Sequence, residues 1–153
     1  LLSNLKLKND TFVHRDFHAS NLMKYKKKLA IIDTQDALIG NRAYDLASLI
    51  DDVRFKSNKK LKVCIYNYYL KLNKNKINKV ILLNDFEILS VIRNMKIIGI
   101  FVRLAVRDKK KKYLKLIPYA WKLIELRIKN NKIFDGLKKI LDLNFSKGIR
   151  NLK

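Results

Sequence analysis

Near the start of the chain, apolar residues come in short runs with polar residues between them. Two such runs, Leu22 to Tyr25 and Leu29 to Ile32, flank a short basic turn at residues 26–28. Apolar runs of this length around a polar turn are typical of a β-hairpin. The pattern therefore predicts a hairpin that brings Asn21, before its first strand, close to Asp33, after its second.

After this region the apolar residues follow the 3.6-residue period of amphipathic helices. In the first predicted helix, Leu46, Ile50 and Val53 share one face with Leu49. Ser57 is expected to cap a second helix that runs to about residue 73. The residues expected to point inward from this second helix are Leu61, Cys64, Ile65, Tyr68, Tyr69 and Leu72.

The longest predicted helix follows a lysine- and asparagine-rich connection over residues 74–83. Asn84 and Glu87 have the spacing of a capping box, so the helix is expected to begin there and to end near Arg107. Over residues 97–106 it is apolar nearly all round. This composition is typical of a buried central helix.

The remaining segments complete a mainly α prediction. Thr11 to Val13 is β-branched and aromatic, which favours a short strand. Residues 109–130 are expected to be helical, with Pro118 starting a new helix or kinking the old one. A last short helix is expected over residues 133–142. The predicted fold class is mainly α (α+β), with a β-hairpin packed on a helical bundle.

The formal net charge of +22 raises the possibility of a nucleic-acid partner. However, 27 of the 35 basic residues are lysines, and isoleucine (18) and asparagine (15) are also abundant, as in an A/T-rich coding sequence. The lysines are scattered and lack the interleaved aromatic residues that stack on bases. A solvated basic surface is therefore favoured over a nucleic-acid interface.

The cysteine content and the apolar runs bear on the compartment. Cys64 is the one cysteine, so no internal disulfide can form and a reducing compartment is favoured. The longest candidate span, Ile97 to Val102, falls well short of the roughly 20 apolar residues that cross a bilayer. We expect a soluble, cytoplasmic protein without a membrane partner.

The most informative motif is the octapeptide at residues 14–21, His-Arg-Asp-Phe-His-Ala-Ser-Asn, followed by Asp33. It contains both histidines of the chain. Asp16 can accept a hydrogen bond from an attacking hydroxyl and orient it, while Asn21 and Asp33 offer oxygen ligands for Mg²⁺. This order of residues predicts ATP-dependent phosphoryl transfer.

Three residues around this motif are candidates for supporting the catalytic loop. The imidazole of His14 is expected to hydrogen-bond the loop backbone rather than to transfer a proton. His18 either braces the loop in the same way or lies near the substrate. Asp45 is either an ordinary charge at a helix N-terminus or a buried carboxylate that accepts backbone N–H groups of the loop, and the second is favoured.

Residues 14–21 with Asp33 resemble the catalytic core of the aminoglycoside phosphotransferase and choline kinase-like family. A histidine two residues after Asp16, and Thr-Gln after Asp33, distinguish the sequence from protein kinases. Residues 32–40, 43–46 and 95–108 are similar to bacterial kinases that phosphorylate the anomeric hydroxyl of N-acetylmuramate and N-acetylglucosamine in cell-wall recycling. The resemblance covers about residues 10–142.

The resemblance implies a protein-kinase-like C-terminal lobe that uses ATP as co-substrate and phosphorylates a small-molecule hydroxyl, such as that of an amino sugar. It also implies that Asp16 is the catalytic aspartate, that Asn21 and Asp33 bind Mg²⁺, and that Asp45 braces the loop. Further candidate substrate-binding residues are Asp36, Arg103 and Arg107. The two arginines either meet an acidic substrate group, or Arg103 pairs with a buried acid and Arg107 is a charge at the C-terminal end of the helix. The second alternative is favoured.

The family places a nucleotide-binding lobe with a glycine-rich loop before this region. This chain has four unclustered glycines, and no glutamate precedes Glu87. We therefore expect residues 1–153 to be the catalytic lobe alone, lacking the nucleotide-binding lobe and inactive without it. Two alternatives remain, a metal-dependent hydrolase that uses His14, Asp16, His18 and Asp33, and an inactive kinase remnant or basic scaffold module.

Overall fold

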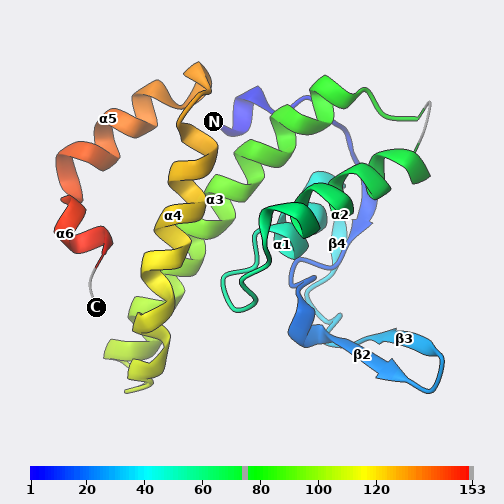
Figure 1. Cartoon of the computed structure of the whole chain (residues 1–153), viewed down its shortest axis with the longest axis horizontal. Helices are drawn as coiled ribbons and strands as arrows, with labels where there is room; N and C mark the ends of the chain where they lie inside the picture. Colours follow the sequence, from blue (N-terminus) through cyan, green and yellow to red (C-terminus); the bar gives the residue numbers. More distant parts are fainter. Residues whose placement is uncertain (74–75, 152–153) are drawn as a thin grey trace. The chain divides into compact units, whose positions relative to one another are not determined.

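The computed structural model describes residues 1–73 and 76–151 (Figure 1). The chain divides into two compact units, one of residues 4–89 and the other of residues 1–3 with residues 90 onwards. Helices predominate, and the strands form two small antiparallel sheets, so the predicted mainly α (α+β) class is confirmed. Within the described ranges, no helix is long and apolar enough to cross a membrane.

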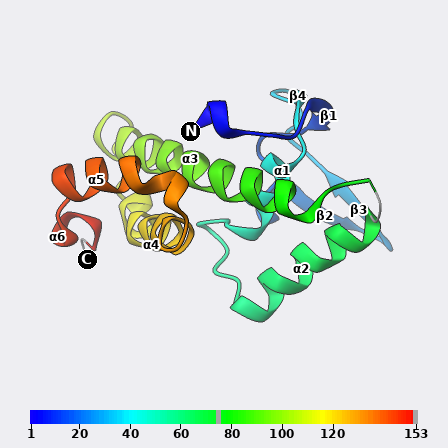
Figure 2. The same ribbon diagram turned by 90° about the horizontal axis from the view of Figure 1, so that it is seen from above.

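The unit of residues 4–89 contains both sheets (Figure 2). Strand β2 (Leu22–Tyr25) pairs with β3 (Lys28–Ile31) through a two-residue turn, which confirms the predicted hairpin. Strand β1 (Asn9–Val13) includes the predicted strand and pairs antiparallel with β4 (Leu38–Asn41). The sequence did not predict β4, because Gly40 and Asn41 are poor strand formers and the partner strand is distant in sequence.

Helices α1 (Ala43–Ile50), α2 (Lys59–Leu72) and the beginning of α3 (Lys79–Val106) pack together in this unit. Apolar residues of α1 and α3 form its buried core, which confirms Leu46 and Ile50 of the predicted inward face. The other two positions differ, because Leu49 is only half-buried and α1 ends at Ile50, before the buried Val53. The core residues are Ala43, Leu46, Ala47, Ile50, Leu82, Phe86 and Leu89.

Two details of the α2 prediction are wrong. Asn58, not Ser57, is the N-cap, because the Asn58 side-chain oxygen accepts from the backbone N–H of Leu61 (2.8 Å). Cys64 and Tyr68 are exposed, as are Leu61 and Leu72. Ile65, Tyr66, Tyr69 and Leu70 pack against the core instead. Tyrosines and apolar residues occur on both sides of α2, so the periodicity did not distinguish these two faces.

The start of α3 also differs from the prediction. The side-chain oxygen of Asn78 accepts from Val80 N and Ile81 N, so the helix begins at Lys79 and not at Asn84. The expected connection over residues 74–83 is correspondingly shorter, and residues 74–75 of it lie outside the described residues. The Asn84 side chain donates to the backbone oxygen of Asn4 (2.9 Å) instead of capping a helix.

The apolar stretch of α3 is not buried all round. Ile97, Phe101 and Ala105 are buried and recur every four residues, whereas Val102 and Val106 are 43% and 67% exposed. Only one stripe of the helix therefore packs against neighbouring elements, and the prediction of a fully buried central helix is wrong.

The second unit contains the end of α3, the 3-10 turns at Lys111–Leu116 and Lys132–Phe134, and three further helices. These helices are α4 (Ile117–Ile128), α5 (Asp135–Asn144) and α6 (Lys147–Arg150). Pro118 lies in the first turn of α4, so it starts a helix rather than kinking one.

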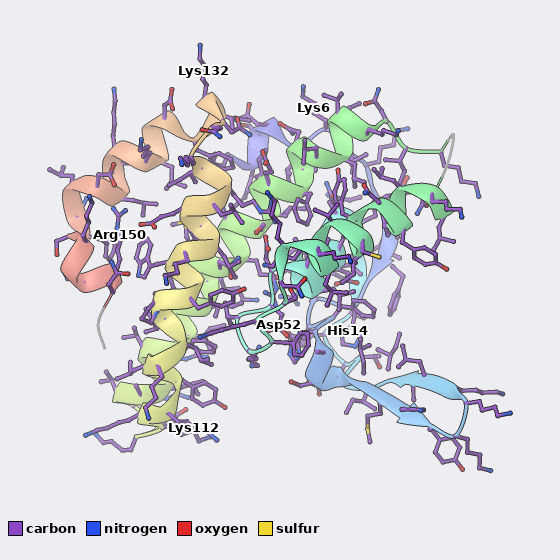
Figure 3. The ribbon with its side chains drawn as sticks, viewed as in Figure 1. Lys6, His14, Asp52, Lys112, Lys132 and Arg150 are labelled. Atoms are coloured by element: carbon purple, nitrogen blue, oxygen red, sulfur yellow. The ribbon has the colours of Figure 1, made fainter. Side chains whose placement is uncertain are left out.

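A buried arginine fastens α6 to the two preceding helices. The guanidinium of Arg150 donates to Glu125 of α4 (3.2 Å) and to Asp142 of α5 (2.8 Å), and lies 5.2 Å from the ring centroid of Trp121. Figure 3 shows Arg150 on the short last helix of the chain. These contacts explain how a four-residue helix packs in place.

Candidate active site

Backbone hydrogen bonds close the loop between β1 and β2 into a tight turn. The carbonyl oxygen of Asp16 accepts from His18 N (2.9 Å) and from the side-chain amide of Asn21 (3.0 Å). The carbonyl of His18 accepts from Asn21 N (2.9 Å). The carbonyl oxygen of Asp16 thus accepts two hydrogen bonds, which fix the backbone at this residue. The Asp16 side chain is exposed.

His14 connects this loop to the end of the hairpin. Its imidazole is buried, with Nδ1 3.3 Å from Asp16 N and Nε2 2.9 Å from the carbonyl oxygen of Ile32. Because the Asp16 N–H donates to Nδ1, the ring proton on Nε2 can donate to Ile32. Figure 3 shows His14 where the strand enters the loop. The imidazole therefore bridges the backbone on either side of the site.

Asp45 holds the first two residues of the loop from the first turn of α1. Its carboxylate accepts from His14 N (2.7 Å) and Arg15 N (3.0 Å). Arg15 has a positive φ of 72°, a left-handed conformation that L residues seldom adopt and that these bonds stabilise. Burial raises the pKa of the nearby Tyr69. The positive charge of Arg42 lowers this pKa, and the negative charge of Asp45 raises it.

Asn21 and Asp33 adjoin through the hairpin backbone. Ile32 N donates to the carbonyl oxygen of Asn21 (3.1 Å), so the residue after Ile32 leaves the hairpin beside Asn21. The Asn21 side-chain nitrogen is used by Asp16, which leaves its amide oxygen as the atom able to bind a cation. Asp33 is exposed, has φ 69°, and accepts from the Gln35 side chain (2.8 Å).

One carboxylate and one amide oxygen are hard donors that fit Mg²⁺ when phosphate oxygens complete its coordination. Within residues 1–73 and 76–151, no group of three or more His, Cys, Asp or Glu residues is placed to hold a metal ion.

The remaining candidate residues are His18, which belongs to the loop itself, and three residues outside it. His18 is buried, and Asp36 is exposed, with its carbonyl oxygen 3.4 Å from the Arg15 guanidinium. Arg103 and Arg107 belong to the second unit, where both are exposed on α3 or directly after it.

Arg107 has an acidic partner of its own. Its Nε donates to the adjacent Asp108 carboxylate at 2.6 Å. This bond is the main cause of the lowered pKa of Asp108, to which the charge of Arg103 adds. A role for Arg103 and Arg107 in substrate binding stays a prediction.

Two buried polar residues behind the loop were missed from the sequence. Asp85 on α3 is fully buried and accepts from the Asn41 side chain (2.7 Å) as well as from backbone N–H groups. The Asn41 side-chain oxygen in turn accepts from Ala43 N (3.0 Å) at the start of α1. The available signal was a lone aspartate on the apolar face formed by Leu82, Phe86 and Leu89.

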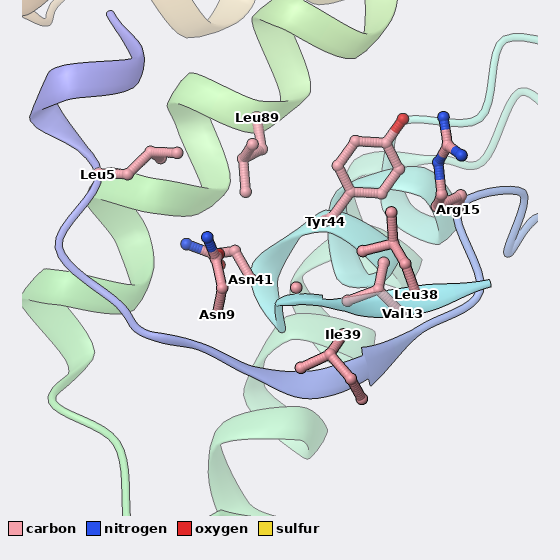
Figure 4. A pocket seen from close by; sticks show the side chains of 10 residues that line it. Leu5, Asn9, Val13, Arg15, Leu38, Ile39, Asn41, Tyr44 and Leu89 are labelled. Carbon is pink, nitrogen blue, oxygen red and sulfur yellow. The ribbon is translucent and has the colours of Figure 1, made fainter. Parts of the chain in front are cut away.

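A pocket of about 240 Å³ lies against the β1–β4 sheet (Figure 4). Its walls are mostly apolar, with Leu5, Val13 and Leu38 among them. Arg15 and Tyr44 lie together at one end of the pocket, and Asn9 and Asn41 at the other. The loop of residues 14–21 thus borders the pocket through Arg15, the residue before Asp16.

Residues 1–63, which contain the whole loop, the hairpin and Asp45, match the family described as "Phosphotransferase enzyme family". The chain is also similar to proteins named N-acetylmuramate/N-acetylglucosamine kinase from three bacteria. It is 29% identical to that of Caulobacter vibrioides over 120 residues (75% of this chain and 33% of the relative). For Neisseria meningitidis serogroup B the identity is 34% over 123 residues (77% and 37%), and for Pseudomonas aeruginosa 32% over 123 residues (76% and 36%).

The chain therefore spans about a third of the length of these curated relatives, while three quarters of its own length is matched. These matches confirm the predicted resemblance to the phosphotransferase family.

Proposed function

We propose that this chain is the catalytic, acceptor-side lobe of an ATP- and Mg²⁺-dependent kinase that phosphorylates a hydroxyl of an amino sugar. The observation that carries the proposal is the hydrogen-bonded loop in which Asp16 and Asn21 share one turn and Asp33 adjoins it through the Ile32–Asn21 backbone bond. The names of the curated relatives support N-acetylmuramate and N-acetylglucosamine as acceptors.

Asp16 is the proposed catalytic residue. Its exposed carboxylate projects from a backbone held by His14, His18 and Asn21, so it can accept a hydrogen bond from the acceptor hydroxyl without a cost in loop ordering. The hydroxyl oxygen then bonds to the γ-phosphorus, the bond from that phosphorus to the β-phosphate oxygen breaks, and Asp16 takes the proton.

Asn21 and Asp33 would hold Mg²⁺. The bound ion would neutralise charge on the phosphate oxygens and keep ATP in line with the acceptor. The contribution of the chain is to supply these two oxygen donors side by side at the open end of one hairpin, one before β2 and the other after β3.

The hairpin surface supports a second part of the proposal, a nucleotide-binding lobe as partner. Met23, Tyr25, Leu29 and Ile31 are each about half exposed or more. A two-stranded hairpin with apolar residues open to water is only marginally stable unless something covers it. We infer that a lobe carrying the ATP phosphates covers this hairpin and that the chain is inactive without it. The reaction takes place in the cytoplasm, where ATP is available.

A fusion tests the proposal directly. The N-terminal part of the meningococcal relative, up to the region matched here, is joined to this chain and assayed with ATP, Mg²⁺ and each sugar. We expect phosphorylation by the fusion and none by the chain alone. Asp16→Asn and Asp33→Asn should each lower kcat by at least about a hundredfold, because each removes a group that acts on the reacting atoms.

Asp135→Asn, which changes an exposed aspartate of the second unit, is the matched control and should leave kcat unchanged. A folded fusion that binds ATP but phosphorylates neither sugar would contradict the proposed acceptor class. Full activity of Asp16→Asn would contradict the assignment of the catalytic residue.

A further inference from the structure

Asp85 is a buried carboxylate far in sequence from the catalytic motif. It lies on α3, is fully excluded from solvent, and accepts from four N–H donors within the unit of residues 4–89. Two donors are the backbone amides of Lys6 (2.9 Å) and Leu7 (2.8 Å). The others are the side-chain amides of Asn41 (2.7 Å) and Asn84 (2.9 Å). A buried carboxylate is stable only with such partners, so Asp85 ties these segments together.

Asp85 fixes which way the Asn41 amide faces. Asn41 is buried at the end of β4, next to Asn9 of the paired strand (Figure 4). Because the carboxylate of Asp85 can only accept, the Asn41 nitrogen must face it and the Asn41 oxygen must face the opposite way. That oxygen accepts from Ala43 N, the first N–H of α1. Arg42, the N-cap residue, makes no side-chain capping bond, so Asn41 serves this helix end.

The helix end that Asn41 holds carries the brace of the catalytic loop. Asp45 is two residues after Ala43, in the first turn of α1, and its carboxylate accepts from His14 N and Arg15 N. The position of the Asp45 carboxylate therefore depends on how the first turn of α1 is placed. A continuous path of short hydrogen bonds leads from Asp85 through Asn41 and α1 to the loop that contains Asp16.

We propose that Asp85 is a positioning residue for the catalytic loop, acting through the amide of Asn41 and the first turn of α1 on Asp45. The importance of Asp85 for catalysis rests on the proposed function of Asp16. The effect of Asp85 on the order of the loop is independent of that function. Through its bonds to Lys6 and Leu7, Asp85 also makes the order of the loop depend on the segment that enters β1.

Amide hydrogen exchange on the full chain tests this inference without ATP or sugar. Asp85→Ala removes the acceptor, and Asn41→Ala removes only the link to α1. In each variant we expect the His14 and Arg15 amides to exchange at least about tenfold faster, as loss of roughly one charged hydrogen bond predicts. Exchange in α4 should not change.

Asp10→Ala is the matched control. Asp10 is an exposed carboxylate whose side chain accepts from Arg42, in the turn after Asn41, and from Thr11. It should leave exchange at His14 and Arg15 unchanged. In the double variant Asp85→Ala/Asn41→Ala, the loop amides should exchange no faster than in the faster single variant, because both changes interrupt one path.

A uniform rise in exchange across α1, α2 and the loop in both single variants would overturn the inference, since it would indicate general destabilisation. Unchanged loop exchange in Asn41→Ala would also overturn it, even if Asp85→Ala does not fold. In the fusion described above, Asn41→Ala should lower kcat and leave the KM for ATP unaltered. If the fusion is inactive but the exchange pattern is as expected, the proposed function is refuted and the positioning role of Asp85 stands.

Discussion

The loop that contains Asp16 and the hairpin that follows it are adjacent in sequence but differ in how they are held. The loop over residues 14–21 is fixed by the buried His14 imidazole, the Asp45 carboxylate and its own backbone hydrogen bonds. The hairpin over residues 22–32 is held by its strand pairing and by the Ile32–Asn21 bond, and most of its side chains are exposed. The proposed acceptor-side residue is thus preorganised, whereas Asp33 extends from an open element.

The comparison shows that apolar character alone did not decide which segment is buried. Leu29 and Ile31 are as apolar as the core residues of α1, yet they are 64% and 48% exposed. Polar Asp85 is completely buried because four N–H donors compensate for its desolvation. In this unit, the half-buried Asp45 and the buried Asp85 hold backbone and amide groups in place, whereas apolar side chains of the hairpin are open to solvent.

Two leucine substitutions should give the largest contrast. Leu46 of α1 is 4% exposed and Leu29 of the hairpin 64%. Leu46→Ala should lower the free energy of unfolding by about 3 kcal/mol, because it leaves a cavity beneath the helix that carries Asp45. Leu29→Ala should change it by less than about 0.5 kcal/mol. Urea denaturation of both variants measures the difference, and equal losses would show that the hairpin is buried in the folded chain.

Removal of the loop brace should have the next largest effect. Asp45→Ala leaves the N–H groups of His14 and Arg15 without their acceptor, at a cost of about 2 kcal/mol in unfolding free energy. Asp36→Ala, at an exposed aspartate beside the same loop, should cost less than about 0.5 kcal/mol. Urea midpoints at equal m-values provide the test, and similar midpoints for both variants would argue against a bracing role.

Asp33 should show stability and activity changing in opposite directions. Its φ of 69° favours glycine, so Asp33→Gly should raise the free energy of unfolding by about 0.5 kcal/mol. The same change removes the proposed Mg²⁺ ligand and should abolish phosphorylation in the fusion. Thermal denaturation and the kinase assay measure the two effects. Asp33→Ala is the control, which should lose activity without a gain in the free energy of unfolding. A destabilised Asp33→Gly would mean that the side chain supports the fold.

The smallest effect is expected at the exposed ion pair of Asp10 and Arg42. The hydrogen bond from Arg42 lowers the pKa of Asp10 below its ordinary value of 3.8. A lowered folded-state pKa stabilises the protein above pH 3.8, and this contribution disappears as the pH falls through the folded-state value. The stability difference between the parent and Asp10→Asn should therefore shrink between pH 5 and pH 3 in urea titrations. A difference that grows on acidification would contradict the sign.

Local patterns predicted those elements whose partners are close in sequence. The β2–β3 hairpin was predictable because its two apolar runs flank a short turn. Pro118 left open a helix start or a kink, and the structure shows the start of α4. Strand β4 pairs with β1 across more than twenty residues, and the packed face of α2 is chosen by the core it meets. Neither is determined by local propensity.

The sequence by itself determined the order of the chemistry, with Asp16, Asn21 and Asp33 at spacings that a single loop and hairpin can satisfy. Tertiary structure decided how that chemistry is held. The bonds that His14 N donates to Asp45 and that the Asn41 amide donates to Asp85 join residues that are 31 and 44 positions apart. Such bonds form only when α1 and α3 pack on a common core, because this packing brings each carboxylate to its N–H donors. A buried N–H group without an acceptor costs free energy, so burial also favours these pairs.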